Sequence, residues 1–172
     1  MKTILVTGTP GCGKSTFSEH LSKALSSRGC TVRTVLVNDL IKSERLYDEH
    51  DSHFDTYIID DRKVRRYLEG YLGSLSADVR IIETHTVTTL PKKLVDQVVV
   101  LTTRTDALFD RLQARGYSKD KIDENMECEI MRVVLEEAVE RFGSKKVKEL
   151  SSNTPEDLED NVETVMADIL EC

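Results

Sequence analysis

Apolar residues along the chain follow two patterns: short unbroken runs, and longer stripes at helical spacing. The short runs are rich in β-branched residues, and such runs are typical of strands that are buried on both faces of a sheet. We therefore expect central strands at 3–7 and 98–101, with further strands at 31–37, 79–83 and 145–150.

The stripes predict helices between these strands. Glycines lie just beyond three of the striped segments, and a proline at the first helical position opens the last one, as is usual at helix ends. Asp106 is expected to cap the helix that ends before Gly116. From 118 to 142 an apolar residue recurs at every fourth position, which favours one long helix with a buried stripe. The expected helices are 14–27, 60–72, 106–115, 118–142 and 154–170.

The alternation of strands and helices is typical of an α/β domain with a parallel sheet and helices on both faces. A length of 172 residues suits a single core, so we expect residues 1–172 to form one domain. The segment 38–57 is the least regular part, and loops of that length inside a domain are usually functional.

Composition narrows the class of protein. The longest aliphatic run is only Val98 to Leu101, so neither a membrane span nor an export signal is expected. The four cysteines, Cys12, Cys30, Cys128 and Cys172, are scattered without a metal-binding spacing and are expected to be reduced. These features predict a protein of the cytoplasm, and also of the nucleus if the source is eukaryotic.

The net charge of −7 is unevenly distributed. Residues 1–122 contain 19 Lys and Arg against 16 Asp and Glu, whereas residues 123–172 contain 5 against 15. The acidic end is either a solvated face or a docking surface for a basic partner. The negative total gives no reason to expect direct binding of DNA.

The residues Gly8 to Ser15, GTPGCGKS, match the pattern GxxxxGK[ST] between an expected strand and an expected helix. In this arrangement, which is called a P-loop, backbone N–H groups surround phosphate oxygens, and the helix N-terminus adds positive potential. The other interpretation is a glycine turn that only joins the two elements. We expect a lysine exposed to the β and γ phosphates of ATP, a serine hydroxyl for Mg²⁺ and a threonine for the α phosphate. The predicted ATP ligands are Gly11, Gly13, Lys14, Ser15 and Thr16.

A P-loop enzyme also needs a carboxylate at a neighbouring strand end to hold the water shell of Mg²⁺. The strand at 79–83 ends with Glu83, at the edge where ligands bind in open α/β sheets. His85 follows two residues later and would point to the same side if the strand continued. Without the P-loop, the two residues would be a strand end and a surface polar residue. We predict a catalytic role for both, with Glu83 reaching Mg²⁺ through water.

Arg115 lies at the end of the third expected helix, where the lid of a nucleotide kinase brings an arginine over the transferring phosphoryl group. The other interpretation is an arginine at a helix C-terminus that the helix dipole favours. A lid built from about 116 to 123 is short and has no room for a hairpin or a metal.

Six segments follow one another in an order that is typical of one known family. They are GTPGCGKST, NDLIKSERLYDEHD, IIETH, DRLQARGYS, ENMECEI with LEEA, and SSNTPEDLEDNV. In these segments, which cover nearly the whole chain, it resembles the adenylate kinase isoenzyme 6 family, whose members are small broken-lid kinases and ATPases that assist maturation of the small ribosomal subunit. The resemblance implies a P-loop nucleoside monophosphate kinase fold, an AMP-binding insert at about 38–62 and a short lid at about 115–125.

The resemblance also assigns roles residue by residue. The family's phosphate ligands fall on the P-loop residues named above and its lid arginine on Arg115, while its acidic-x-histidine motif falls on Glu83 and His85. The family usually has aspartate before the histidine, so the glutamate here is one methylene longer. A second departure is Thr102, where members commonly have arginine, and Arg104 therefore receives no family role.

These observations favour a Mg²⁺-dependent kinase that transfers the γ-phosphoryl group of ATP to AMP and hydrolyses ATP slowly, as a monomer. Lys42 and Arg45 are the predicted contacts of the AMP phosphate. The alternative is an assembly ATPase that switches contacts with a basic protein of the small ribosomal subunit during rRNA maturation, with incidental AMP kinase activity. A third hypothesis is a P-loop kinase for a nucleoside or a coenzyme precursor.

Overall fold

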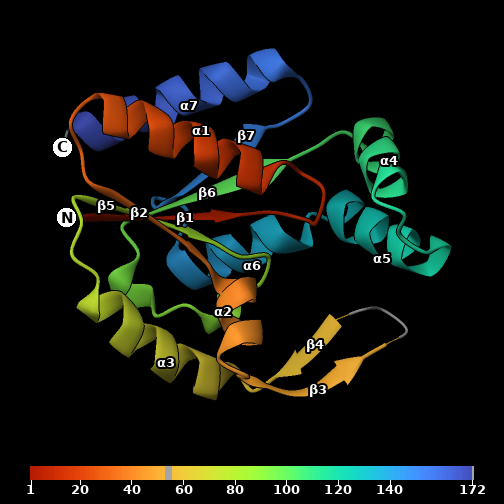
Figure 1. The fold of residues 1–172 in the computed structure, drawn as a ribbon. Helices are drawn as coiled ribbons and strands as arrows, with labels where there is room; N and C mark the ends of the chain where they lie inside the picture. The colour runs from red at the N-terminus through yellow and green to blue at the C-terminus, as the bar shows by residue number, and fades with distance from the viewer. Residues whose placement is uncertain (53–55, 172) are drawn as a thin grey trace.

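A five-stranded parallel sheet forms the centre of the structure, which is a computed structural model describing residues 1–52 and 56–171 (Figure 1). The strand order is β2-β5-β1-β6-β7, and each pairing within this sheet is parallel. This arrangement confirms the predicted α/β class. The strands are β1 (Lys2–Thr7), β2 (Val32–Leu36), β5 (Val79–Glu83), β6 (Gln97–Thr102) and β7 (Val147–Ser151).

Helices cover both faces of this sheet, as predicted. Figure 1 shows α1 and α7 along one face, α3 and α6 along the other, and α4 and α5 beyond the carboxyl ends of the strands. The helices are α1 (Lys14–Ser27), α2 (Val37–Ser43), α3 (Asp61–Ser74), α4 (Thr105–Ala114), α5 (Lys119–Ile130), α6 (Val133–Phe142) and α7 (Pro155–Leu170). Two short 3₁₀ helices, η1 (Val87–Thr89) and η2 (Lys92–Leu94), follow β5.

Alternation along the central strand separates two cores. Ile4 and Val6 pack with side chains from α1 and α7, whereas Leu5 between them packs with side chains from α2, α3 and α6. Successive strand residues point to opposite faces, so β1 contributes to both cores at once. A third, smaller cluster lies between α4 and α5 and contains the buried Leu108, Leu112 and Ile122.

The prediction of one long helix at 118–142 is wrong. The segment forms α5 and α6, separated by Arg132 in the left-handed conformation with φ 56. Residues spaced by four advance about 40° around a helix at each step, so a long stripe winds away from any one face. Ile122 and Ala138 are buried, but Ile130 is 62% exposed beside the break.

The segment 38–57 is also more regular than predicted. It contains most of α2, all of β3 (Tyr47–Asp51) and the first half of β4 (Thr56–Ile59), which pairs antiparallel with β3, while residues 53–55 lie outside the described residues. Its period-two pattern is short and mostly polar, which hides a strand from sequence reading.

Smaller corrections concern helix ends and cysteines. Gly73 lies within α3 rather than beyond it, and the cap of α4 is Arg104, with Asp106 in the first turn. Cys12, Cys30 and Cys128 are free thiols, and Cys172 lies outside the described residues. Among the described residues, no helix is both long enough and apolar enough to cross a membrane.

The turn after β1 passes very close to β6. A Cβ placed on Gly8 would lie 2.4 Å from the Leu101 carbonyl oxygen and 2.6 Å from Cys12 Sγ, and Gly8 has φ 143. Only glycine fits here, because both the backbone conformation and the space exclude a side chain.

We expect Gly8→Ala to destabilise the protein more than Gly29→Ala. Gly29 has φ 85, but no atom lies within 4 Å of the place that an added methyl group would take, so alanine there costs only the left-handed backbone penalty, about 1–2 kcal/mol. Gly8→Ala adds overpacking against β6, about 1–3 kcal/mol more. Urea unfolding of both variants measures the difference, and equal losses would contradict the close packing of the turn on β6.

Candidate active site

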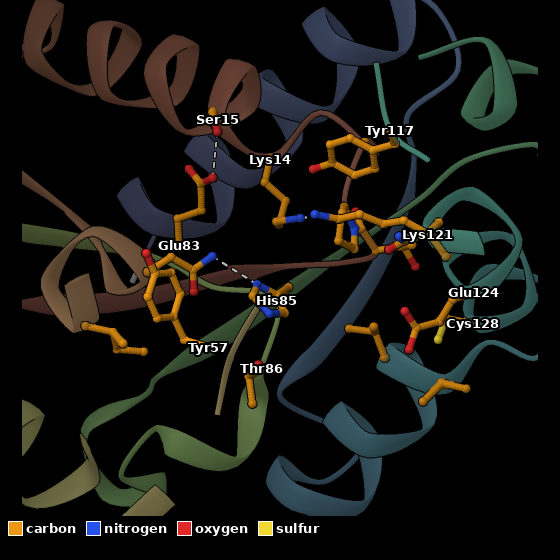
Figure 2. Close-up of a pocket in the computed structure, with 18 of the residues that line it drawn as sticks. Lys14, Ser15, Tyr57, Glu83, His85, Thr86, Tyr117, Lys121, Glu124 and Cys128 are labelled. Carbon is orange, nitrogen blue, oxygen red and sulfur yellow. Dashed lines mark hydrogen bonds between the residues drawn. The ribbon is translucent and has the colours of Figure 1, made fainter. Parts of the chain in front are cut away.

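A cavity of about 660 Å³ lies at the carboxyl edge of the sheet. Its walls come from the P-loop, the end of β5, the segment 115–128, and the α2, β4 and α6 elements. Figure 2 shows Glu83 and His85 on one side of Lys14, with Tyr117 and Lys121 on the other. Residues that are far apart in sequence therefore face one space, as expected at this edge of an open α/β sheet.

The predicted P-loop connects β1 to α1, and Gly13 is the N-cap of α1 with φ 92. Lys14 differs from the prediction, because its side chain is buried rather than exposed. Its ammonium donates hydrogen bonds to the carbonyl oxygens of Gly8 at 2.9 Å and Thr9 at 3.1 Å. The lysine thus closes the loop on itself and brings a positive charge to its centre.

Ser15 and Glu83 meet beside this loop. Ser15 Oγ donates to Glu83 Oε1 at 2.6 Å, while Glu83 Oε2 is buried without a hydrogen-bond partner in the described structure. A buried carboxylate oxygen without a partner is costly unless a ligand satisfies it, and carboxylate and hydroxyl oxygens are ligands that Mg²⁺ prefers. The residues therefore fit Mg²⁺, and the longer glutamate spans the distance to the P-loop serine.

His85 lies just past the end of β5, because the strand stops at Glu83 rather than continuing. Asn38 Nδ2 lies 2.9 Å from His85 Nδ1, and since an amide nitrogen only donates, Nδ1 accepts and the ring proton is on Nε2. The ring is open to the solvent of the cavity but has protein around it at longer range. This partial burial, with the positive charges of Lys14 and Lys121, lowers the pKa of His85 from 6.5 to about 4. The imidazole is therefore neutral near pH 7.

The lid residues lie opposite. Arg115 ends α4 and Tyr117 precedes α5, and both line the cavity together with Lys121. Lys121 Nζ lies 4.3 Å from the centre of the Tyr117 ring, a cation–π contact that orients both side chains. The side chain of Arg115 is exposed and makes no hydrogen bond or ion pair with the described residues, so its guanidinium remains available to an anion.

The remaining wall is more apolar. Ile41, Ile59, Val133 and Val134 line it, with Tyr57 among them. Lys42 Nζ lies 5.4 Å from the centre of the Tyr57 ring. These side chains, called the recess below, line the same cavity as the P-loop.

Not all predicted residues line this cavity. Gly11, Gly13, Lys14, Ser15, Glu83, His85, Arg115 and Lys42 do, whereas Thr16 and Arg45 are exposed and do not. Sequence reasoning missed Asn38, Tyr57 and Lys121. The available signal was only regional, because Asn38 and Tyr57 lie within the expected AMP-binding insert and Lys121 within the expected lid.

Several known proteins are similar to this chain in sequence. The family model described as AAA domain matches residues 4–132. The adenylate kinase isoenzyme 6 homolog of Schizosaccharomyces pombe is 38% identical over 165 residues, which cover 96% of this chain and 90% of the relative. The homolog of the same name from Caenorhabditis elegans is 36% identical, with coverage of 94% and 86%. The putative adenylate kinase of Methanosarcina barkeri is also 36% identical, with coverage of 96% and 86%.

Solved structures share the fold. A shikimate kinase from Bacteroides thetaiotaomicron and a gluconokinase from Sinorhizobium meliloti 1021 each superpose with a TM-score of 0.59. Both alignments cover 99% of this chain, and they cover 99% and 92% of the two kinases, at 17% and 15% identity. The likeness confirms the predicted P-loop kinase-like fold. The relatives described above show that this chain, with its P-loop and with Glu83 and His85 at the end of β5, belongs to the adenylate kinase isoenzyme 6 family.

Proposed function

We propose that the chain is a Mg²⁺-dependent nucleoside monophosphate kinase that transfers the γ-phosphoryl group of ATP to AMP. The observation that carries this proposal is that the P-loop and the recess of Tyr57, Lys42 and apolar side chains line one cavity. Its volume of about 660 Å³ lies within the usual range of small-molecule sites. The donor phosphates belong at the P-loop and the acceptor nucleotide in the recess.

Transfer breaks the bond between the γ phosphorus and its bridging oxygen to the β phosphate, and forms one to an oxygen of the AMP phosphate, giving two ADP. That AMP oxygen is already ionised, so no general base is required, and positioning and electrostatics supply the rate. Lys14 and Arg115 neutralise charge on the transferring group. Lys42 lies beside the Tyr57 ring of the acceptor recess, and Arg45 is left out because it lies outside the cavity lining.

Ser15 and Glu83 are the residues that would hold Mg²⁺ at this site. When bound with ATP, the ion supplies charge neutralisation on the phosphates. Before that, the hydrogen bond between Ser15 and Glu83 fixes both oxygens at the helix start. His85 offers an Nε2–H donor, held in place by Asn38, which can orient a phosphate oxygen or a water.

We also propose slow ATP hydrolysis and a role in maturation of the small ribosomal subunit. The exposed carboxylates of α7 support a basic partner: Glu156, Glu159, Asp160 and Glu163. Under this second candidate function, ATP hydrolysis would switch contacts with such a protein, and AMP phosphorylation would be incidental.

An acceptor screen tests the main proposal. We expect two ADP from each ATP and AMP at many turnovers, and a loss of at least about 100-fold in Lys14→Met, which keeps the buried stem but removes the ammonium. Circular dichroism checks the fold of the variant. If phosphate release needs no AMP and rises with a basic ribosomal protein, the second candidate function, an ATPase switch, is favoured. If another small molecule is the better acceptor, the assignment of AMP as the acceptor fails.

Glu83→Gln should raise the Mg²⁺ concentration needed for half-maximal activity. Glutamine keeps the size and the contact to Ser15 but removes the charge, and a neutral amide is a weaker partner for a divalent cation and its water shell. The expected loss of apparent Mg²⁺ affinity is about 10–100-fold, measured by titrating Mg²⁺ at saturating nucleotide. Glu140→Gln, at an exposed position of α6 outside the cavity lining, provides a matched control. An unchanged Mg²⁺ dependence in Glu83→Gln would remove the metal role.

His85→Ala should lower ATP hydrolysis more than transfer to AMP. Hydrolysis needs a water to be oriented, whereas the AMP phosphate is oriented by its own binding site. Because the pKa of His85 is about 4, its protonation begins only well below neutral pH, and the factor by which His85→Ala lowers each rate, relative to the parent at the same pH, should stay constant between about pH 5.5 and 8. His20→Ala, an exposed histidine of α1, is the control. Equal losses in both reactions would mean that His85 only shapes the site.

A further inference from the structure

A carboxylate from the lid side of the cavity holds the P-loop. Glu129, near the end of α5, accepts a hydrogen bond from Thr9 Oγ1 at 2.5 Å and one from the Thr103 backbone N–H at 2.6 Å, one at each carboxylate oxygen. Thr9 and Thr103 are only 1% and 6% exposed. Hydrogen bonds to a charged acceptor are stronger than neutral ones, and poor solvation strengthens them further. One side chain therefore joins the P-loop, the segment after β6 and α5.

A second, weaker connection anchors the same end of α5. Arg132, after the last turn, donates to Glu149 Oε2 at 2.6 Å, and Glu149 Oε1 accepts from Thr102 Oγ1 at 3.2 Å. The side chains of this ion pair are 52% and 36% exposed, and exposed pairs contribute little to stability. Glu129 is thus the main polar contact between this end of α5 and the P-loop.

An arginine makes the corresponding contact from α4. Arg111 donates to the carbonyl oxygens of Ser152 and Asn153, both at 2.9 Å, and lies 3.5 Å from that of Gly11. Arg115 and Tyr117 come between Arg111 and Glu129 in the chain and line the cavity. The lid is therefore tied to the phosphate-binding loop on both of its flanks.

We propose that Glu129 is a positioning residue, which fixes Thr9 of the P-loop relative to α5 so that the lid residues and the phosphate site keep one geometry. The role in catalysis rests on the proposed phosphoryl transfer. The hydrogen-bonded connection itself does not rest on that proposal, because it joins α5 to the P-loop without any bound ligand. Small displacements of groups that surround a reacting centre cost large factors in rate, which gives this connection its importance.

Substitutions at both ends separate positioning from simple structural support. Glu129→Ala removes both hydrogen bonds. Glu129→Gln retains them, because its amide oxygen accepts from the Thr103 N–H and its amide nitrogen donates to the Thr9 hydroxyl, which can also accept. Thr9→Val removes only the P-loop half and Thr9→Ser restores it. Glu127→Ala, exposed on the same helix, is the matched control.

The experiment measures kcat and KM for ATP at saturating AMP, and amide hydrogen exchange at Thr103 without nucleotide. We expect Glu129→Ala to lose about 10–100-fold in kcat with a change of less than about threefold in KM, and to exchange faster at Thr103. Glu129→Gln should stay within about threefold of the parent in kcat. Thr9→Val should lose rate like Glu129→Ala but retain slow exchange at Thr103, which keeps the proposal testable if Glu129→Ala does not fold.

Three results would overturn the proposal: parent kcat in both Glu129→Ala and Thr9→Val, a loss in Glu129→Gln as large as in Glu129→Ala, or an equal loss in Glu127→Ala. If the parent protein itself transfers no phosphoryl group to AMP, the proposed function fails. In that case exchange decides the connection separately, because unchanged exchange at Thr103 in Glu129→Ala would show that the carboxylate does not hold this segment.

Discussion

Parallel hydrogen bonding of β1 between β5 and β6 is the constraint on which the site depends. The register pairs Val6 with Glu83 on one side and Thr7 with Val100 on the other. The chain therefore leaves β1 into the P-loop directly beside the end of β5 and the segment that follows β6. The meeting of Ser15 and Glu83 follows from this register, because backbone pairing fixes which side chains reach the edge together.

Local signals account for the part of the fold and site that the sequence predicts. The α1 helix has the predicted bounds because its glycine-rich start and its apolar stripe are both short-range features. The β5 strand is equally clear, since a buried run ends there in a charged residue. Once the P-loop motif is placed, the sheet edge follows from α/β topology, and Lys14, Glu83, His85 and Arg115 do share one cavity.

Long-range contacts account for what sequence reading could not supply. Thr9 and Glu129 are 120 residues apart, and neither residue type in its local context indicates the other. The break at Arg132 is similar, because the four-residue repeat continues through it and only the packing of α6 on the sheet requires the change of direction. A related reason explains why Lys14 is predicted to be exposed although it is buried. The motif indicates that the lysine binds phosphate, but it does not indicate that the ammonium also donates hydrogen bonds to backbone carbonyl oxygens of the same loop.

The small cluster of Leu108, Leu112 and Ile122 is separate from the two cores of the sheet, and this separation bears on what holds the α4–α5 hairpin in place. Full burial of such a side chain contributes about 1.5–3 kcal/mol, so a cluster of three is weaker than either sheet core. The α4–α5 hairpin therefore depends on its polar contacts as well as on its apolar ones. Arg111 and Glu129 hold it against the rest of the protein, so substitutions that weaken the small cluster place a larger share of that task on these two side chains.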